Sequence, residues 1–390
     1  MKRYVSLIAG IIVQICLGGI YAFSSYVPTL SGDWGFTALQ TQTVFGITIL
    51  FFTLYMIPAG KLLRKWGPRR LILISGTLFI TGHFLASLSG GNYPVFLLAY
   101  ILFISPAMSF GYVCPVAAGL LWFPEHRGLV TGLSVAGYGT GGMILAGVIE
   151  LLLSRGWPLF RILQFNGALW GAVIILAGIL SATPDGLIRT GSREEHDSIK
   201  THLKDFTGIT FFLFFGTLPG LMLIGALKPF GLFHGVAPAT AAVAVAALSV
   251  GNGSGRITWG IIADRLSPRR TAFLNFTGVL ISVILLFLAG LNRGLFIPAG
   301  FVLGFCYGGP LVIAPDQTAR VYGAANLGSV YPTALAFHGV AAALGAPLAG
   351  LLVSAVNSYT PVLLIAGSGT LAGALGYYFM TRNTENLKHL

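Results

Sequence analysis

Apolar segments of helix length follow one another along almost the whole chain, and short stretches that carry most of the charged residues separate them. A helix needs about 20 mostly apolar residues to cross the roughly 30 Å hydrocarbon core of a bilayer. Because the segments reach this length, the pattern predicts twelve membrane-spanning helices and an all-α membrane protein. They are expected at residues 4–30, 38–60, 71–91, 94–121, 128–153, 159–181, 206–232, 237–262, 271–291, 294–317, 325–355 and 360–381.

The composition excludes a soluble protein of this length. Of the 390 residues, 55% are hydrophobic and only 9% are charged, and the mean hydropathy is +0.83. So few charges cannot cover a soluble domain of this size. The three cysteines, Cys16, Cys114 and Cys306, lie inside apolar segments, where small buried side chains are expected rather than disulfides or metal ligands. No nucleotide-binding, zinc or other cofactor motif occurs, so we expect no enzyme, no metal and no cofactor, and any active transport must use gradients.

The basic residues lie in alternate loops, which is the positive-inside pattern. The net charge of +12 therefore indicates a membrane orientation rather than a partner nucleic acid. With both termini in the cytoplasm, 18 of the 23 lysines and arginines fall on the cytoplasmic side of the cell's inner membrane. Arg155, Arg161, Lys228 and Arg293 fall outside, and Arg256 lies within the membrane. The first segment has a basic start but no cleavage site after it, so we expect it to be retained.

The chain resembles itself at a shift of about 195–200 residues, which indicates a duplicated half. The sequence GKLLRKWGPRR at 60–70 aligns with GIIADRLSPRR at 260–270, and AGYG at 136–139 aligns with AFHG at 336–339. Tyr112 and Pro115 align in the same way with Tyr307 and Pro310. The repeat predicts an N-terminal six-helix half at 1–182, a charged cytoplasmic linker at 183–205 and a C-terminal six-helix half at 206–390.

Two such halves, the linker and the loop after the second and eighth segments resemble the major facilitator superfamily over the whole chain. Its loop motif has the pattern G-x-x-x-D-R-x-G-x-R-R. The second copy here keeps Gly260, Asp264 and Arg265, whereas the first keeps Gly60 but has Arg64 where the acid belongs. The resemblance implies the major facilitator fold and a cytoplasmic latch between the halves that depends on Asp264. Alternatively, the basic residues of this loop serve only to set the topology.

Arg256 is the strongest candidate for a functional residue because the two halves differ there: the equivalent position in the first half is Met56. It lies eight residues before Asp264, or about 12 Å along a helix, so it is expected near the middle of the membrane. Asn252 lies one turn earlier on the same face. A buried ion pair could explain the arginine, but every acid falls at a segment end, in a loop or in the linker. The pattern therefore favours an anionic ligand, and a guanidinium suits a carboxylate.

Tyrosines at related depths complete the candidate site. Tyr112 and Tyr307 occupy equivalent positions, each beside a proline that would break its helix, and Tyr138 and His338 form a second equivalent pair. Tyr21 is a further candidate from the first segment. Each tyrosine could instead be packed in the core with its hydroxyl satisfied. His338 could add a second, titratable positive charge or be a neutral, hydrogen-bonded ring.

The eighth segment has an asparagine one turn before an arginine, and tyrosines accompany this pair in other segments. In this pattern the chain resembles the monocarboxylate transporters and the bacterial oxalate/formate antiporters. Animal monocarboxylate transporters have Asp in place of Asn252 and a lysine in the first helix, which this chain lacks. Oxalate exchangers place a lysine in the eleventh helix, where His338 is the nearest basic residue. The resemblance without that second fixed charge implies a monoanion such as lactate, pyruvate or formate.

We therefore expect a monomeric secondary transporter for small monocarboxylates, working by alternating access in the lipid bilayer. Proton coupling is expected, with His338 as the carrier of the proton. Carboxylate exchange of the oxalate/formate type is the first alternative, and a membrane sensor for the same acids is the second. A drug exporter would need an acid in the cavity, and an organic-phosphate exchanger would favour two symmetric arginines.

Overall fold

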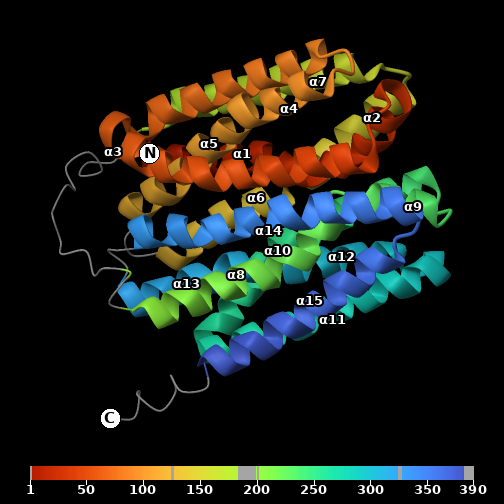
Figure 1. Cartoon of the computed structure of the whole chain (residues 1–390). Helices are drawn as coiled ribbons and strands as arrows, with labels where there is room; N and C mark the ends of the chain where they lie inside the picture. The colour runs from red at the N-terminus through yellow and green to blue at the C-terminus, as the bar shows by residue number, and fades with distance from the viewer. Residues whose placement is uncertain (1, 124–126, 183–198, 200–201, 324–326, 382–390) are drawn as a thin grey trace.

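The computed structural model describes residues 2–123, 127–182, 199, 202–323 and 327–381, and these residues form helices joined by short connections (Figure 1). The first half contains α1 (Lys2–Leu17), η1 (Gly18–Ser25), α2 (Val27–Trp34), α3 (Ala38–Leu88), α4 (Tyr93–Ala99), η2 (Tyr100–Ile104), α5 (Ser105–Trp122), α6 (Arg127–Ser154) and α7 (Leu159–Leu180). The second contains α8 (Leu203–Ile224), α9 (Leu227–Phe233), α10 (Pro238–Arg265), α11 (Pro268–Leu291), η4 (Arg293–Leu295), α12 (Phe296–Tyr307), α13 (Pro310–Tyr322), α14 (Leu327–Val356) and α15 (Thr360–Thr381).

The helices confirm the all-α membrane fold. Ten segments of the described chain are long and apolar enough to span a membrane. One of them, α3, consists of two helical runs on either side of Gly67, whose φ of 76° and ψ of 167° interrupt the helix. The 28-residue helix α10 is a further crossing that is absent from the ten because GNGSGR makes it less apolar. Together these segments account for the twelve expected crossings.

Several crossings contain a break that the apolar pattern did not reveal. The first crossing passes through the 3₁₀ segment η1, and the seventh is divided between α8 and α9. The tenth crossing is interrupted at Gly308 and Gly309, just before Pro310. By contrast, α5 continues through Pro115, so the expectation that both prolines break their helices is right for Pro310 and wrong for Pro115.

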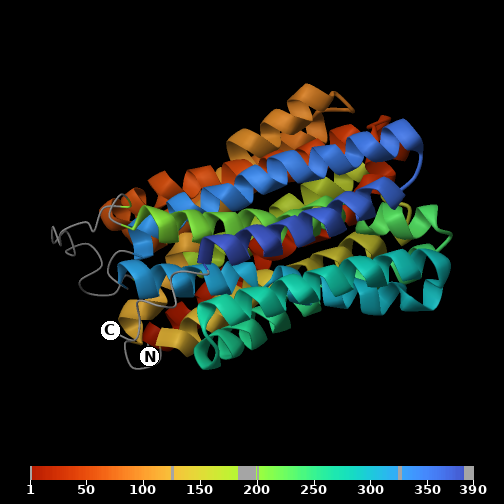
Figure 2. The same cartoon turned by 60° about the horizontal axis from the view of Figure 1, so that its bottom comes forward.

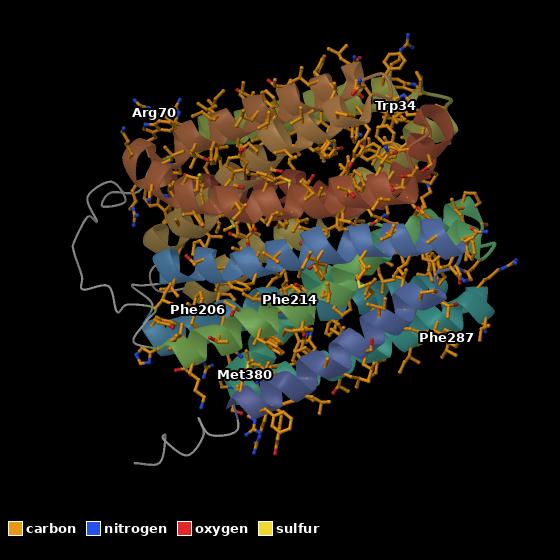
Figure 3. All side chains as sticks on the ribbon, viewed as in Figure 1. Trp34, Arg70, Phe206, Phe214, Phe287 and Met380 are labelled. Atoms are coloured by element: carbon orange, nitrogen blue, oxygen red, sulfur yellow. The ribbon has the colours of Figure 1, made fainter. Side chains whose placement is uncertain are left out.

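The long helices run side by side along one axis in both views (Figures 1 and 2). Helix α1 begins and α15 ends at the same end of this bundle, which we call the terminal end. Figure 3 shows Arg70 at the terminal end and Trp34 at the opposite end. Large apolar side chains are exposed on the outer surface, among them Leu88 at 72% and Leu291 at 76%. Such exposure suits contact with lipid.

The two halves pack together through glycines. Helix α3 contacts α14, and α6 contacts α10. A Cβ atom added to Gly46 would lie 2.3 Å from the carbonyl oxygen of Ala342, and one added to Gly139 would lie 2.7 Å from the backbone nitrogen of Gly253. The backbones therefore approach as closely as small residues permit. The boundaries proposed for the halves remain predictions, and most of the linker at 183–205 lies outside the described residues.

A buried ion pair also joins the halves. Lys228 in α9 is 4% exposed, and its ammonium group bonds to the carboxylate of Glu150 in α6. The sequence places Lys228 simply on the outer side of the membrane. The structure shows instead that the lysine is enclosed, because Glu150 supplies its counter-ion.

Candidate functional site

Arg256 is fixed from within its own helix by Asn252. Arg256 is only 3% exposed, and its Nε donates a 3.0 Å hydrogen bond to Oδ1 of Asn252, which lies four residues earlier in α10. A separation of four residues brings the two side chains to one face of the helix. This contact confirms the relative placement that the sequence predicted and points the guanidinium away from its own backbone.

The other half of the chain supplies the remaining contacts of the guanidinium. Nη1 donates to the carbonyl oxygen of Val135 in α6, and Nη2 donates to the hydroxyl oxygen of Tyr21 in η1, both at 3.0 Å. All three acceptors are neutral, and no buried Asp or Glu occurs among the described residues. These bonds use three of the five guanidinium hydrogens, which leaves one on each Nη nitrogen. Two N–H groups therefore remain that can donate to an anion, with the hydroxyl of Tyr112 within hydrogen-bonding reach of the guanidinium.

Aromatic rings surround the guanidinium. Its carbon lies 5.5 Å from the ring centre of Tyr138, within the range of a cation–π contact. Tyr138 contacts Tyr112 at 5.1 Å and Tyr21 at 5.7 Å, measured between ring centres. Tyr307 lies 5.7 Å from Tyr21. The structure thus brings together the tyrosines that the sequence selected from four different crossings.

His338 joins this group from α14 and is 2% exposed. Its Nδ1 lies 3.0 Å from the hydroxyl oxygen of Thr217 in α8, and that hydroxyl donates to the carbonyl oxygen of Leu213 at 2.6 Å. A threonine has one hydroxyl hydrogen, so its oxygen must accept the hydrogen on Nδ1. In the neutral ring this assignment leaves Nε2 as a hydrogen-bond acceptor.

A cavity of about 20 Å³, the room of roughly one water molecule, lies among these residues. It is lined by Tyr21, Ile49, Phe52, Tyr112, Tyr138, Arg256, Leu311, Tyr331, Leu335 and His338. Three buried polar groups of the site, Nδ2 of Asn252 and the hydroxyls of Tyr138 and Tyr307, have no hydrogen-bond partner, and Tyr138 lines the cavity itself. A buried polar group without a partner is costly, so these groups are available for a ligand.

Three contributors to the site were missed from the sequence. Tyr331 lies seven residues before His338, which is two helical turns and the same face, so helical spacing could have identified it. Phe52 is equivalent to Asn252 under the 200-residue shift, and its ring lies 6.0 Å from that of Tyr138. The repeat therefore contained a signal for Phe52. Val135 contributes a backbone oxygen, which no side-chain pattern can reveal.

The loop motif lies apart from this site. Asp264 and Arg265 are exposed, and neither has a hydrogen bond or ion pair to another described residue. A Cβ at Gly260 would be 3.5 Å from Val312, and one at Gly60 would meet nothing within 4 Å. The proposed latch at Asp264 therefore stays a prediction.

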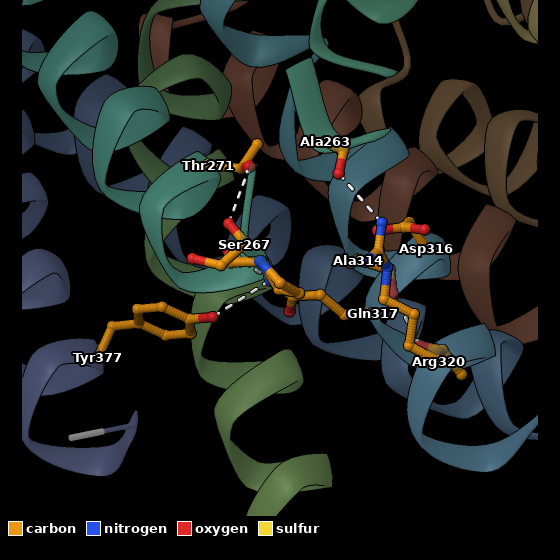
Figure 4. Close-up of polar contacts among 10 residues, drawn as sticks. Ala263, Ser267, Thr271, Ala314, Asp316, Gln317, Arg320 and Tyr377 are labelled. Carbon is orange, nitrogen blue, oxygen red and sulfur yellow. Dashed lines mark hydrogen bonds and ion pairs between the residues drawn. The ribbon is translucent and has the colours of Figure 1, made fainter. Parts of the chain in front are cut away.

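Contacts at the end of α10 come instead from Arg320 in α13, which donates to the carbonyl oxygen of Ala263 at 3.0 Å and pairs with Asp316 at 2.9 Å (Figure 4). Nearby, Nε2 of Gln317 donates to the hydroxyl oxygen of Tyr377 at 3.1 Å. These contacts tie helices of the second half to one another.

A second cavity, of about 30 Å³, lies within the first half beside His83, Tyr26 and Tyr100. Nδ1 of His83 bonds to the carbonyl oxygen of Phe79 at 3.0 Å, and Nδ2 of Asn166 donates to the hydroxyl of Tyr26 at 2.7 Å. The bond of Asn166 joins two crossings of the first half, whereas that of His83 lies within α3, and both suit structural residues. No group of three or more metal-ligating side chains occurs in the described part of the chain.

Membrane-spanning helices that converge on one central polar site are typical of membrane transport proteins. The chain belongs to the Major Facilitator Superfamily, whose family model matches residues 9–227 and 206–389. It is 28% identical over 347 residues to the uncharacterized MFS-type transporter YhjX of Escherichia coli, covering 84% of this chain and 83% of that protein. It is 23% identical to the oxalate:formate antiporter of Oxalobacter formigenes, covering 100% and 94%.

Among solved structures, the fold is similar to that of the nucleoside transporter NupG, with a TM-score of 0.77. The alignment covers 97% of this chain and all of that chain at 13% sequence identity, so this likeness concerns the fold alone. The chain is thus a multi-pass membrane transporter of this superfamily, and the antiporter relative agrees with the branch that its residues resemble.

Proposed function

We propose that this transporter carries small monocarboxylate anions of the lactate, pyruvate and formate type, and that Arg256 binds the carboxylate. The observation that carries this proposal is a buried guanidinium whose bonds all go to neutral oxygens. Arg256 and Tyr138 line one small cavity, to which the two remaining N–H groups and the Tyr138 hydroxyl can donate, and the unpaired amide of Asn252 lies next to the guanidinium. A carboxylate supplies the charge and the acceptors that this group of donors lacks.

The size and charge of the cavity support a small monoanion. At about 20 Å³ it must widen even for the smallest acids. Arg256 is the only fixed charge among the residues that line it. A dianion such as oxalate would bring a second negative charge without a second fixed cation to meet it.

The way the two halves share Arg256 supports a cycle of alternating access. The arginine belongs to α10, whereas Val135 and Tyr21, which accept two of its bonds, belong to the first half. When the halves rock apart these bonds must break, and a bound carboxylate replaces them. The basic residues at the terminal end, such as Arg70, support an inner-membrane protein with both termini in the cytoplasm (Figure 3).

For the coupling we propose proton symport, in which Nε2 of His338 takes a proton only after the substrate has neutralised Arg256. Before that step, a second cation in the same buried cavity would be repelled by the guanidinium. Exchange of one carboxylate for another is the second candidate, favoured by the relative that is an oxalate:formate antiporter.

The test is uptake of labelled lactate, pyruvate and formate into proteoliposomes that contain the purified protein. Arg256→Gln is expected to abolish uptake, and Arg293→Gln, which removes an exposed guanidinium, serves as the matched control. Retained uptake by Arg256→Gln would refute the proposal. An imposed proton gradient should drive accumulation if the cycle is symport, whereas exchange requires a counter-substrate inside the vesicles.

A further inference from the structure

The ring of His338 has a fixed orientation of donor and acceptor. Thr217 uses its hydroxyl hydrogen on the carbonyl oxygen of Leu213 and accepts a bond from Nδ1 of His338. Thr217 does not line the central cavity, whereas His338 does. The Nδ1 edge is therefore turned towards Thr217 in α8, and because His338 lines the cavity while Thr217 does not, we assign Nε2 to the cavity side of the ring.

Nε2 differs from the other polar groups around the cavity in its hydrogen-bonding capacity. The free guanidinium N–H groups and the amide of Asn252 can only donate, and a tyrosine hydroxyl can either donate or accept. The neutral Nε2 can only accept. Arg256 keeps the ring in this neutral form while a substrate approaches, because a second positive charge in the same enclosed space is unfavourable.

We propose that Nε2 of His338 makes the site selective for 2-hydroxy acids over 2-oxo acids. This inference rests on the proposed function, since it assumes that Arg256 holds the carboxylate. The hydroxyl next to the carboxylate of a 2-hydroxy acid can donate to Nε2. A 2-oxo acid presents only a carbonyl oxygen, so two acceptors would face each other in a buried site. A site built to bond a substrate hydroxyl discriminates strongly against an analogue that lacks it.

Thr217 acts in this scheme as a positioning residue, because it determines which ring nitrogen carries the hydrogen. Without its oxygen, the hydrogen is free to move to Nε2, and the ring would then present a donor to the cavity. Thr217→Val is therefore expected to change selectivity without touching the carboxylate contacts. Thr370→Val is the matched control, since this buried threonine bonds only to the carbonyl of Ala366 in its own helix.

The experiment compares the binding of lactate, pyruvate and propionate to the purified protein by titration calorimetry. It is done at an alkaline pH that keeps the ring of His338 neutral both before and after substrate binds, so that the proton step of the proposed symport does not occur during the titration. Propionate has the carboxylate but neither oxygen substituent. We expect lactate to bind on the order of tenfold more tightly than pyruvate, since a buried acceptor left unpaired costs about that factor. Thr217→Val should bring the ratio to about one or reverse it, with propionate affinity unchanged, while Thr370→Val keeps the wild-type ratio.

His338→Phe provides a second test that does not depend on the folding of the threonine variant. Removal of the acceptor should reduce lactate affinity to that of propionate. Equal binding of lactate and pyruvate by the wild type, or a ratio that neither variant changes, would overturn this inference alone. Failure of all three acids to bind would overturn the proposed function and this inference with it.

Discussion

Lys228 and Glu150 form an ion pair between the two halves of the chain, and the glutamate is much more exposed than the lysine. The side chain of Lys228 is 5% exposed and that of Glu150 is 26% exposed. Removing either partner leaves the other unpaired, but the two unpaired charges are solvated to different extents. The two substitutions should therefore differ in their effect on stability.

We predict that Glu150→Gln lowers the free energy of unfolding by about 3 kcal/mol, because it leaves a buried ammonium without a counter-ion. Lys228→Met should cost less, since the remaining carboxylate is partly hydrated. The double variant should be more stable than Glu150→Gln alone. Denaturant unfolding in detergent measures all three. Asp316→Asn, in a more exposed pair, should cost less than about 1 kcal/mol and serves as the control. Additive losses at Glu150 and Lys228 would contradict the coupling.

Two buried tyrosine hydroxyls differ in their hydrogen bonding, so removing one should affect ligand binding and removing the other should affect stability. The hydroxyl of Tyr138 has no partner, whereas that of Tyr26 accepts a bond from Asn166. Tyr138→Phe should weaken carboxylate binding about tenfold and leave the melting temperature unchanged, because the lost bond forms only with substrate. Tyr26→Phe should lower the melting temperature and leave affinity unchanged. Calorimetric titration and thermal unfolding of both variants check this, and the reverse assignment would refute it.

The contact between Gly139 and Gly253 leaves no space for a methyl group. Gly139→Ala should push α6 away from α10, displace the nearby oxygen of Val135 from Arg256 and reduce transport at least tenfold. Gly147→Ala in the same helix is the control, because a Cβ there meets nothing within 4 Å. Initial rates of uptake into proteoliposomes, at equal amounts of folded protein, provide the measurement. Equal activity of the two variants would show that this approach of the halves is not required.

Replacing the neutral partner of Arg256 with an acid should make binding depend on pH. In Asn252→Asp, an ionised carboxylate would bond to Nε of Arg256 and compete with the substrate for its charge. Protonation of that carboxylate removes the competition, so affinity should rise as the pH falls, more steeply than in the wild type. Titration of a fully ionised acid at several pH values tests this. An affinity equal to that of the wild type at every pH would contradict it.

The sequence predicted the fold, and the structure brings together the residues that the sequence selected around Arg256. Apolar segment length predicted the crossings, and the repeat located Arg256 as a position where the halves differ. Tyr112, Tyr138 and Tyr307 followed from the same comparison, and Tyr21 from its place in the first segment. The breaks at η1 and between α8 and α9 were not predictable, because glycine and small residues continue the apolar pattern through them.

Contacts between distant residues account for what was missed. The bond from Arg256 to Val135 depends on backbone geometry, and the pairing of Lys228 with Glu150 depends on how α9 meets α6. The role of Thr217 could not be foreseen either, since it requires knowing that α8 lies beside α14. Helical periodicity describes one element at a time and does not determine which elements become neighbours.

The helix that holds Arg256 is long enough to span the membrane, but its mean hydropathy is too low to place it among the ten strongly apolar segments. A survey of related genomes by hydropathy would therefore count one crossing too few in any protein that has the same polar stretch. Every later loop would then be assigned to the wrong side of the membrane. Reporter fusions or labels designed from such an assignment would be placed in the wrong compartment, so the polar helix must be counted before sidedness is assigned.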